Sequence, residues 1–244
     1  MSTTQTTPDG LWIVTTTITA APPKPPVIPD TATCVLIDNA PNWKGDYDTE
    51  TPKIATGVSK YVDVNNGRNY NVAYTNKAGF RFHVSFATVK APVFNFCTDL
   101  YVKCDDWKEV QNLEIDMNQV MPDGRTVIMG IQAATGSKSW EYTTTPNNKS
   151  HWNKSNIAVD PSTWQAGVWK HLRLFYSCTL DGTVTYIGIE VDGIYTPFQN
   201  ATGVSILALG WKPIGLLLCN FQQEGNTAKG TINIYAKQYQ QFCW

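Results

Sequence analysis

Apolar and polar residues alternate through most of this chain from about residue 33 to residue 244. In residues 80–86, four apolar side chains alternate with three polar ones, and residues 113–118 repeat the pattern. A period of two is typical of a strand with one face buried and one face in water. Because no segment of a dozen residues repeats with a period of 3.6, we predict an all-β fold, an antiparallel sandwich of two sheets. The further strands that the alternation predicts are 126–132, 170–176, 183–191, 214–221 and 231–239.

One segment lacks this alternation. Residues 135–165 are rich in polar turn residues, so we predict a long loop region there. Long loops within compact domains tend to carry function.

The first 33 residues differ in composition from the rest. A Thr-rich stretch leads to Ala20-Ala21-Pro22-Pro23-Lys24-Pro25-Pro26, which favours extended polyproline II structure. We predict a linker or edge segment over residues 1–33 and a β-sandwich domain over residues 34–244. The apolar patch at residues 11–14 is a candidate edge strand.

The charge of the chain argues against two classes of partner. Charged residues make up 16% of the chain, and the formal net charge is -1. No basic run of the kind that neutralises phosphates is present, so we expect no nucleic-acid partner. No stretch of 18 apolar residues exists, so we expect no membrane span. The polar residues 1–7 show no signal peptide, which leaves either a removed export signal or a cytosolic protein.

The cysteines bear on whether the protein is exported or cytosolic. Their even number and the Thr- and Asn-rich composition favour at least one disulfide, and therefore a secreted or cell-surface protein. A Cys97–Cys104 bond would close a small loop, and a Cys34–Cys243 bond would tie the two ends of the chain together. The alternative is that several are small buried hydrophobic residues. The six are Cys34, Cys97, Cys104, Cys178, Cys219 and Cys243.

Two neighbouring segments resemble a stretch of laminin-G-like and concanavalin A-like domains. Residues 167–176 read Gly-Val-Trp-Lys-His-Leu-Arg-Leu-Phe-Tyr, and residues 184–193 read Val-Thr-Tyr-Ile-Gly-Ile-Glu-Val-Asp-Gly. Residues 230–235 look like the closing strand of such domains, and the chain is also similar to uncharacterised secreted bacterial proteins that share Asp-Met-Asn-Gln-Val at 116–120. The resemblance implies a concanavalin A-like jelly roll, an architecture shared by lectins, adhesion modules, glycoside hydrolases and polysaccharide lyases.

A pair of carboxylates is the first candidate for chemistry. Glu114, Asp116 and Asn118 alternate along one predicted strand, so they share a face, while Ile115 and Met117 enter the core. The two carboxylates lie roughly 7 Å apart at Cα. Their charges repel, which favours a proton on one of them.

The resemblance implies roles for these residues. Glucanases of the laminarinase and lichenase type carry E-x-D-x-E or E-x-D-x-x-E on one strand, with nucleophile, assistant and acid/base in that order. Carried over, Glu114 is the nucleophile and Asp116 the assistant. The acid/base position holds Asn118 or Gln119, and an amide cannot donate a proton to a leaving group. The alternative is a solvated carboxylate pair, with or without a structural calcium ion; we expect no other cofactor.

A second polar set and two tryptophans complete the candidate site. Arg81 and His83 alternate on another strand, and both strands can meet on one concave face. Such a face suits saccharide hydroxyls, or a lyase that neutralises a uronate and removes its C5 proton. Trp140 and Trp152 are candidates for stacking on sugar rings. The catalytic candidates are thus Glu114, Asp116 and His83, and the substrate-binding candidates are Arg81, Asn118, Gln119, Gln132, Trp140 and Trp152.

Three functions are compatible with these residues. We rank binding of a poly- or oligosaccharide by a secreted, monomeric, lectin-like sandwich first, because the acid/base Glu of the glucanases is missing. The second is a polysaccharide-cleaving enzyme, either a glycoside hydrolase or a lyase. The third is a structural or adhesive surface domain.

Overall fold

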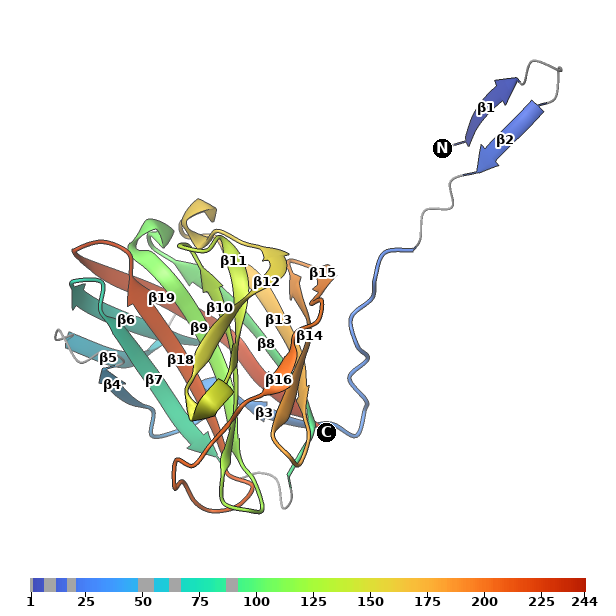
Figure 1. Ribbon diagram of the computed structural model, residues 1–244. Helices are drawn as coiled ribbons and strands as arrows, with labels where there is room; N and C mark the ends of the chain where they lie inside the picture. The colour runs from blue at the N-terminus through green and yellow to red at the C-terminus, as the bar shows by residue number, and fades with distance from the viewer. Residues whose placement is uncertain (1, 7–11, 17–20, 48–54, 62–66, 87–91) are drawn as a thin grey trace.

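The computed structural model describes residues 2–6, 12–16, 21–47, 55–61, 67–86 and 92–244. Two antiparallel β-sheets pack face to face, as Figure 1 shows. The described helices are four turns of three residues each, and none is long or apolar enough to cross a membrane. The predicted all-β, two-sheet jelly-roll sandwich is therefore confirmed. The helical turns are η1 (Ile37–Asn39), η2 (Trp107–Glu109), η3 (Pro146–Asn148) and η4 (Pro161–Thr163).

The first sheet, called the cleft sheet below, has the strand order β12-β11-β10-β9-β18-β7-β4, and β17 pairs with β10. Its central strand, β9, pairs with β10 on one side and β18 on the other. Its strands are β4 (Lys44–Tyr47), β7 (Gly79–Phe86), β9 (Val110–Val120), β10 (Thr126–Ala134), β11 (Ser139–Thr144), β12 (His151–Ala158), β17 (Ile206–Leu207) and β18 (Leu217–Gly225).

The second sheet, called the back sheet, has the order β15-β14-β13-β8-β19-β6-β5, with β16 on β14 and β3 on β19. Its longest strand, β19, pairs with β8, β6 and β3 and so joins segments distant in sequence. The strands are β3 (Thr33–Leu36), β5 (Ala55–Tyr61), β6 (Gly67–Thr75), β8 (Asn95–Cys104), β13 (Lys170–Cys178), β14 (Thr183–Val191), β15 (Ile194–Pro197), β16 (Thr202–Val204) and β19 (Lys229–Cys243).

The core lies between the sheets and is built by the alternation seen in the sequence. On β9, Leu113, Ile115 and Met117 are at most 3% exposed and belong to the core cluster. Tyr70 of the back sheet stacks on Phe221 of the cleft sheet, with ring centroids 4.3 Å apart. Each such buried side chain contributes about 1.5–3 kcal/mol. The burial of these three side chains turns the residues between them, Glu114 and Asp116, to the outer face of the cleft sheet.

The prediction of a loop over residues 135–165 was wrong. This segment contains β11 and β12, the two outermost strands at one edge of the cleft sheet. Five of the eight residues of β12 are polar, because an edge strand buries little of either face. Its sequence therefore lacks the apolar alternation by which the other strands were predicted.

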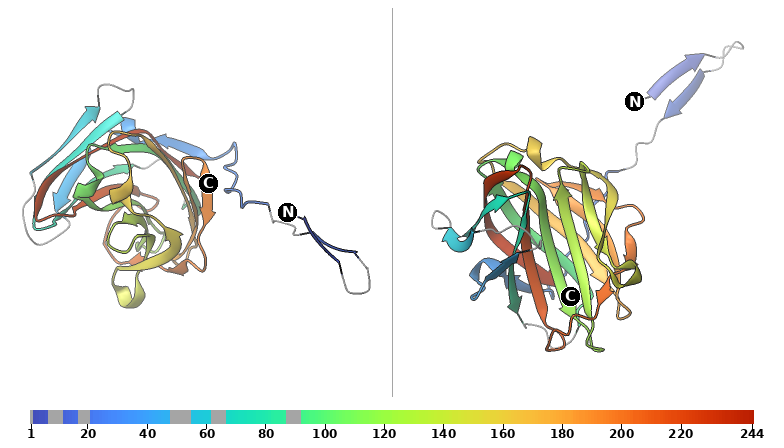
Figure 2. Two further views of the ribbon diagram at one scale, coloured as in Figure 1. Left: turned by 90° about the horizontal axis from the view of Figure 1, so that it is seen from above. Right: turned by 60° about the vertical axis from the view of Figure 1, so that its left-hand side comes forward.

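The N-terminal strands stand apart from the sandwich. β1 (Ser2–Thr6) pairs with β2 (Trp12–Thr16) in a separate two-stranded sheet, and residues 21–29 form no strand. Figures 1 and 2 show this hairpin away from the body of the molecule. The candidate edge strand at residues 11–14 thus joins neither large sheet, and Leu11 lies outside the described residues. The domain boundary between residues 33 and 34 stays a prediction.

The expected disulfides are absent, because all six cysteines are free. Cys97 and Cys104 lie on one extended strand, β8, so their Cα atoms are about 23 Å apart at 3.3 Å per residue. Cys34 lies opposite Phe242 rather than Cys243, so the two thiols leave opposite faces of the pair β3–β19. Burial raises the pKa to about 12 for the thiols of Cys97, Cys104, Cys178, Cys219 and Cys243. The argument for export from paired cysteines therefore falls away.

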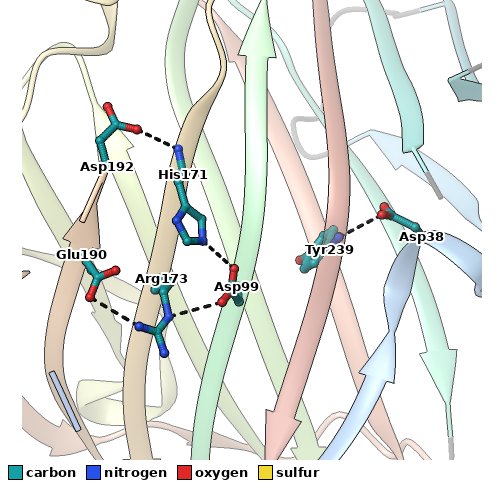
Figure 3. A network of polar contacts seen from close by, with 7 residues as sticks. All are labelled: Asp38, Asp99, His171, Arg173, Glu190, Asp192 and Tyr239. Carbon is teal, nitrogen blue, oxygen red and sulfur yellow. Dashed lines mark hydrogen bonds and ion pairs between the residues drawn. The ribbon is translucent and has the colours of Figure 1, made fainter. Parts of the chain in front are cut away.

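A buried carboxyl fastens the turn η1 to β19. Asp38 is 3% exposed, and its Oδ2 accepts a hydrogen bond from the Tyr239 N–H at 2.9 Å, as Figure 3 shows. Arg68 donates to the backbone carbonyls of Asp38 (3.0 Å) and Ala40 (2.8 Å). Burial raises the pKa of Asp38 to about 7, although the Tyr239 N–H and the Arg68 charge oppose the shift.

Candidate functional site

The polar residues of β9 face away from the core. Glu114, Asp116 and Asn118 point to the outer face of the cleft sheet, and their exposed fractions are only 8%, 5% and 2%. Neighbouring strands and loops thus cover them on the outer side. Three carboxylate or amide side chains in this setting form the floor of a pocket rather than a solvated surface.

Three rows of side chains cross the sheet at β9, as the strand registers fix. In the first row, Glu114 lies between Gln132 of β10 and Gln222 of β18, and Arg81 of β7 follows. In the second, Asp116 lies between Gly130 and Asn220, and His83 follows. In the third, Asn118 lies between Ile128 and Leu218, and Ser85 follows. The structure thus brings the strands of Glu114 and His83 onto one face of the cleft sheet, as predicted.

A cleft of about 400 Å³ lies over these rows. Its floor holds Arg81, Glu114, Asp116 and Asn118 of the sequence-predicted set. Asn220, Gln222 and Glu224 of β18 join them. A second hollow of about 250 Å³ is lined by His83, Leu218 and three residues that the two hollows share: Arg81, Trp211 and Asn220. His83 therefore lies beside the main cleft and not in it.

Two tryptophans stand on either side of the β9 carboxylates. Trp152 of β12 lines the cleft, and its ring lies over Gly130 on the β10 side. Trp211, in the loop between β17 and β18, lines both the cleft and the hollow next to His83, on the β7 side. A flat ligand above Glu114 and Asp116 is thus flanked by indole rings.

Gly130 makes room for this arrangement. A Cβ atom there would lie 2.6 Å from Asp116 Oδ1, 3.0 Å from Thr143 Cγ2 and 3.1 Å from Trp152 Cη2. The missing side chain therefore lets the Asp116 carboxylate lean across β10 beneath the Trp152 ring.

The polar groups of the floor are only partly paired with one another. Asn220 Nδ2 donates to Asp116 Oδ2 at 3.2 Å. The Oδ1 atoms of Asn118 and Asn220 are buried and have no hydrogen-bond partner among the described residues. Behind the sheet, burial raises the pKa of Tyr186 well above its usual value, and the Asp116 charge adds to the shift. The floor is thus electronegative and holds two buried acceptors that are open to a donor.

Besides His83, three sequence-predicted residues lie outside the cleft. Gln119 directly follows Asn118 on β9, so its side chain points to the opposite, inner face of the sheet. Its Oε1 accepts from the Val93 N–H and its Nε2 donates to the Val93 carbonyl, each at 2.9 Å. Trp140 is 1% exposed and packs in the core, since its side chain leaves the inner face of β11. Gln132 shares the face of Glu114, but its amide donates to Glu141 Oε2 at 2.5 Å, beyond the lining of the cleft. Neither Gln119 nor Trp140 can therefore contact a ligand there.

The cleft residues missed from the sequence include four that offer a carboxylate, an amide or an indole. Asn220, Gln222 and Glu224 alternate on β18 and gave the same signal as Glu114, Asp116 and Asn118. The predicted strand ended at residue 221, four residues short, so the alternation was not recognised. Trp211 lies in a loop without periodicity and gave no signal of its own.

No calcium site is apparent in the described part of the chain. No group of three or more His, Cys, Asp or Glu side chains there could hold a metal ion. Glu114 and Asp116 alone are too few charged ligands for a dedicated calcium site.

The outer face of the back sheet also carries charged residues, but they are paired. His171 Nε2 contacts Asp99 Oδ1 at 2.7 Å, and Arg173 bridges Asp99 (3.2 Å) and Glu190 (3.4 Å), as Figure 3 shows. The His171 ring also stacks on Tyr101 at 4.3 Å. Such cross-strand pairs stabilise a sheet, and no comparable set of unpartnered buried oxygens occurs among these described residues.

Comparison with known proteins bears on the fold. No family model and no curated protein matches the sequence. Among solved structures, the chain is similar to a β-glucanase from Bacillus licheniformis (10% identity, 87% of this chain and 97% of that chain, TM-score 0.46). It is also similar to lectin II from Ulex europaeus (14% identity, 88% of this chain and 97% of that chain, TM-score 0.43). A third similar structure is a carbohydrate-binding module of the β-sandwich superfamily (10% identity, 97% of this chain and 70% of that chain, TM-score 0.38). These three proteins are concanavalin A-like sandwiches.

Proposed function

We propose that the cleft binds a neutral segment of a poly- or oligosaccharide. The observation that carries the proposal is Asn118. It is 2% exposed, lies between the apolar residues Ile128 and Leu218, and its Oδ1 has no partner among the described residues. A buried acceptor left unpaired costs about 1–3 kcal/mol. An apolar residue would suit the folded protein better, so an amide here supports a ligand that donates hydrogen bonds.

The rest of the cleft supports the same class of ligand. Asn220 offers a second buried acceptor, and Glu114, Asp116 and Gln222 offer further planar polar groups. Sugar hydroxyls are hydrogen-bond donors, and the apolar faces of sugar rings stack on aromatic side chains such as Trp152 and Trp211.

The charge of the cleft favours a neutral glycan. Glu114, Asp116 and Glu224 contribute three carboxylates to its lining, and Arg81 contributes one cation. A uronate or sulfated chain would meet net repulsion there. This balance argues against the lyase alternative, in which a cation must neutralise a uronate. The secreted or cell-surface location and the monomeric state remain part of the proposal, on composition alone.

The test is the variant Asn118→Leu. We expect its free energy of unfolding to rise by about 1–2 kcal/mol, since the unpaired acceptor is removed between two apolar neighbours. We also expect affinity for soluble neutral glucans, xylans or mannans to fall about tenfold or more, by calorimetric titration. A purely structural Asn118 would leave the affinity unchanged.

Tryptophan variants give an independent check. Trp152→Ala and Trp211→Ala are each expected to weaken binding and to remove part of the fluorescence change on titration. The matched control is Trp169→Ala, which should leave binding unchanged, because the Trp169 ring lies against Lys103 and Lys237 on the back sheet. Failure of the wild-type protein to bind any neutral glycan of the panel would overturn the proposal.

A further inference from the structure

The row of floor residues that contains Asp116 ends differently on its two sides. It runs from His83 of β7 through Asn220 and Asp116 to Gly130 of β10, which is three strand spacings or about 14 Å. A glycan lying across the strands follows this row. The part of a glycan that the cleft accepts therefore depends on whether the chain can continue past each end.

On the β10 side, two side chains close the row. Thr143 of β11 and Trp152 of β12 lie directly opposite each other on their strands. Thr143 Cγ2 and Trp152 Cη2 lie 3.0 and 3.1 Å from the place where a Cβ atom of Gly130 would be. The Trp152 ring thus reaches back across β11 and, with Thr143, covers the floor at Gly130. These two side chains form an end wall of the cleft.

The segment that contains β17 extends this closure along the first half of β10. The Ile128 N–H of β10 donates to the Ser205 carbonyl at 2.8 Å. Thr145, just after β11, joins the two parts, because its Oγ1 accepts from the Ile206 N–H at 2.8 Å and donates to the Ile206 carbonyl at 3.1 Å. The flank of β10 is therefore occupied by β17 and β11 in turn.

Two apolar side chains stand on this flank of the cleft. Leu207 and Leu209 line the cleft and also line a third hollow of about 550 Å³. A chain would have to pass both of these side chains to leave the cleft on the β10 side.

On the β7 side, the groove continues. The row passes Asn220 into the hollow of about 250 Å³ beside His83, which shares Trp211 with the cleft. Beyond β7, Lys44 of β4 lies opposite His83 and is exposed. A bound chain can therefore leave the cleft over β18 and β7 toward solvent.

The buried acceptors of the floor also favour the end of a chain. The Oδ1 atoms of Asn118 and Asn220 have no partner among the described residues. A terminal sugar carries a free hydroxyl where an internal sugar carries a glycosidic oxygen, so the terminal unit has one more hydrogen-bond donor. A site with buried acceptors favours the ligand that brings the extra donor, because those acceptors are otherwise left unpaired.

We infer that the cleft recognises the end of a neutral glycan chain, with the terminal sugar against Trp152 and the rest of the chain leaving over β7. This inference rests on the proposed function. An internal segment needs an exit at both ends of the row, and the end wall closes one of them. Both ends of a glycan carry a free hydroxyl, so the experiment must also tell the reducing end from the non-reducing end.

The experiment counts how many protein molecules bind to each glycan chain. Short and long fractions of soluble neutral glucans, xylans and mannans are titrated by calorimetry at equal concentrations of chains. We expect the number bound per chain and the affinity per chain to be the same for both fractions, because chain length does not change the number of ends. A number that rises with length would overturn the inference and leave the proposed function standing. Absence of binding to every glycan would overturn both.

Capping the reducing end by reductive amination identifies the end that binds. Unchanged binding of the capped chains, at a number per chain that does not depend on length, assigns the cleft to the non-reducing end. Loss of binding assigns the cleft to the reducing end.

A pair of tryptophan variants tests the end wall itself. Trp152→Ala opens the wall, whereas Trp211→Ala removes the same kind of ring from the open side. Both should bind more weakly. With Trp152→Ala, we expect the number bound per long chain to double or more, since internal segments can then pass through the cleft. With Trp211→Ala, the number should stay as in the wild type. An unchanged number for Trp152→Ala would overturn the role of Trp152 as the stop.

Discussion

Gly130 shows how a single residue shapes the cleft. In Gly130→Ala, the new Cβ would displace the Asp116 carboxylate and the Trp152 ring, which lie 2.6 and 3.1 Å from its position. We expect overpacking to cost about 1–3 kcal/mol of stability and glycan affinity to fall about tenfold. Calorimetric titration and urea unfolding measure the two effects. Gly136→Ala is the control, since a Cβ there meets nothing within 4 Å; equal behaviour of the two variants would contradict this prediction.

The cysteines allow a second test at the residue scale. Cys34 is exposed, whereas the other five thiols are buried and their pKa values are raised to about 12. Because the thiolate is the reactive form, we expect a thiol reagent to modify one cysteine of the native protein and six after denaturation. Cys34→Ser should abolish the native reaction. Fewer than six thiols in the denatured, unreduced protein would reveal a disulfide and contradict the structure.

At the scale of elements, the attachment of η1 to β19 should make stability depend on pH. The pKa of Asp38 in the folded protein is about 7, above the usual value of about 3.9 in an unfolded chain. Between these values the folded protein holds a proton that the unfolded chain has released. The contribution of Asp38 to stability is therefore full below about pH 4 and is lost as the pH rises through 7.

The variant Asp38→Asn tests this dependence. Asparagine still accepts from the Tyr239 N–H but does not titrate. We expect the stability of the wild type relative to the variant to decline from pH 4 to pH 8 by up to about 4 kcal/mol, the limit set by three pKa units. Urea unfolding at several pH values measures the difference, and parallel curves for the two proteins would refute the prediction.

The strands of the cleft sheet show how far the sequence leads to the site. Alternation alone placed Glu114, Asp116 and Asn118 on one face and Arg81 and His83 on one face of another strand, which the structure separates from β9 by β18. Because consecutive residues of a strand point to opposite faces, Gln119 lies on the other face from Asn118, and in the structure the Gln119 side chain points inward. The contribution of Trp211 could not be predicted, because a loop residue is positioned by tertiary contacts and not by a local period.

At the scale of the whole molecule, the sandwich does not depend on the N-terminal hairpin. β1 and β2 pair with each other and with no other described strand, whereas β3 pairs with β19 from Thr33 onward. We expect removal of residues 1–28 to change the free energy of unfolding by less than about 0.5 kcal/mol and to leave glycan affinity unchanged. Thermal unfolding and titration of the shortened chain provide the measurement; a large loss of stability would show that the hairpin packs on the sandwich.

The fold class followed from the period of two, but the pairing of distant segments did not. The alternation of residues 231–239 predicted a strand, yet nothing in those residues indicates that β19 lies between β8 and β6. Sheet order depends on long-range packing of strands whose patterns are alike. The short strand β3 and the polar edge strand β12 lack the pattern, since each buries little of its surface.

The strand β9 has one further consequence, for how this protein can change. From residue 113 to residue 119 its odd-numbered side chains point inward and its even-numbered side chains line the cleft, so two independent patterns alternate over these seven positions. A substitution in one set of residues leaves the other set in place. An insertion or deletion of one residue would exchange the two faces and place Glu114 and Asp116 in the core. New ligand preferences are therefore accessible by point substitution at residues 114, 116 and 118, and shifts of register along this strand are not.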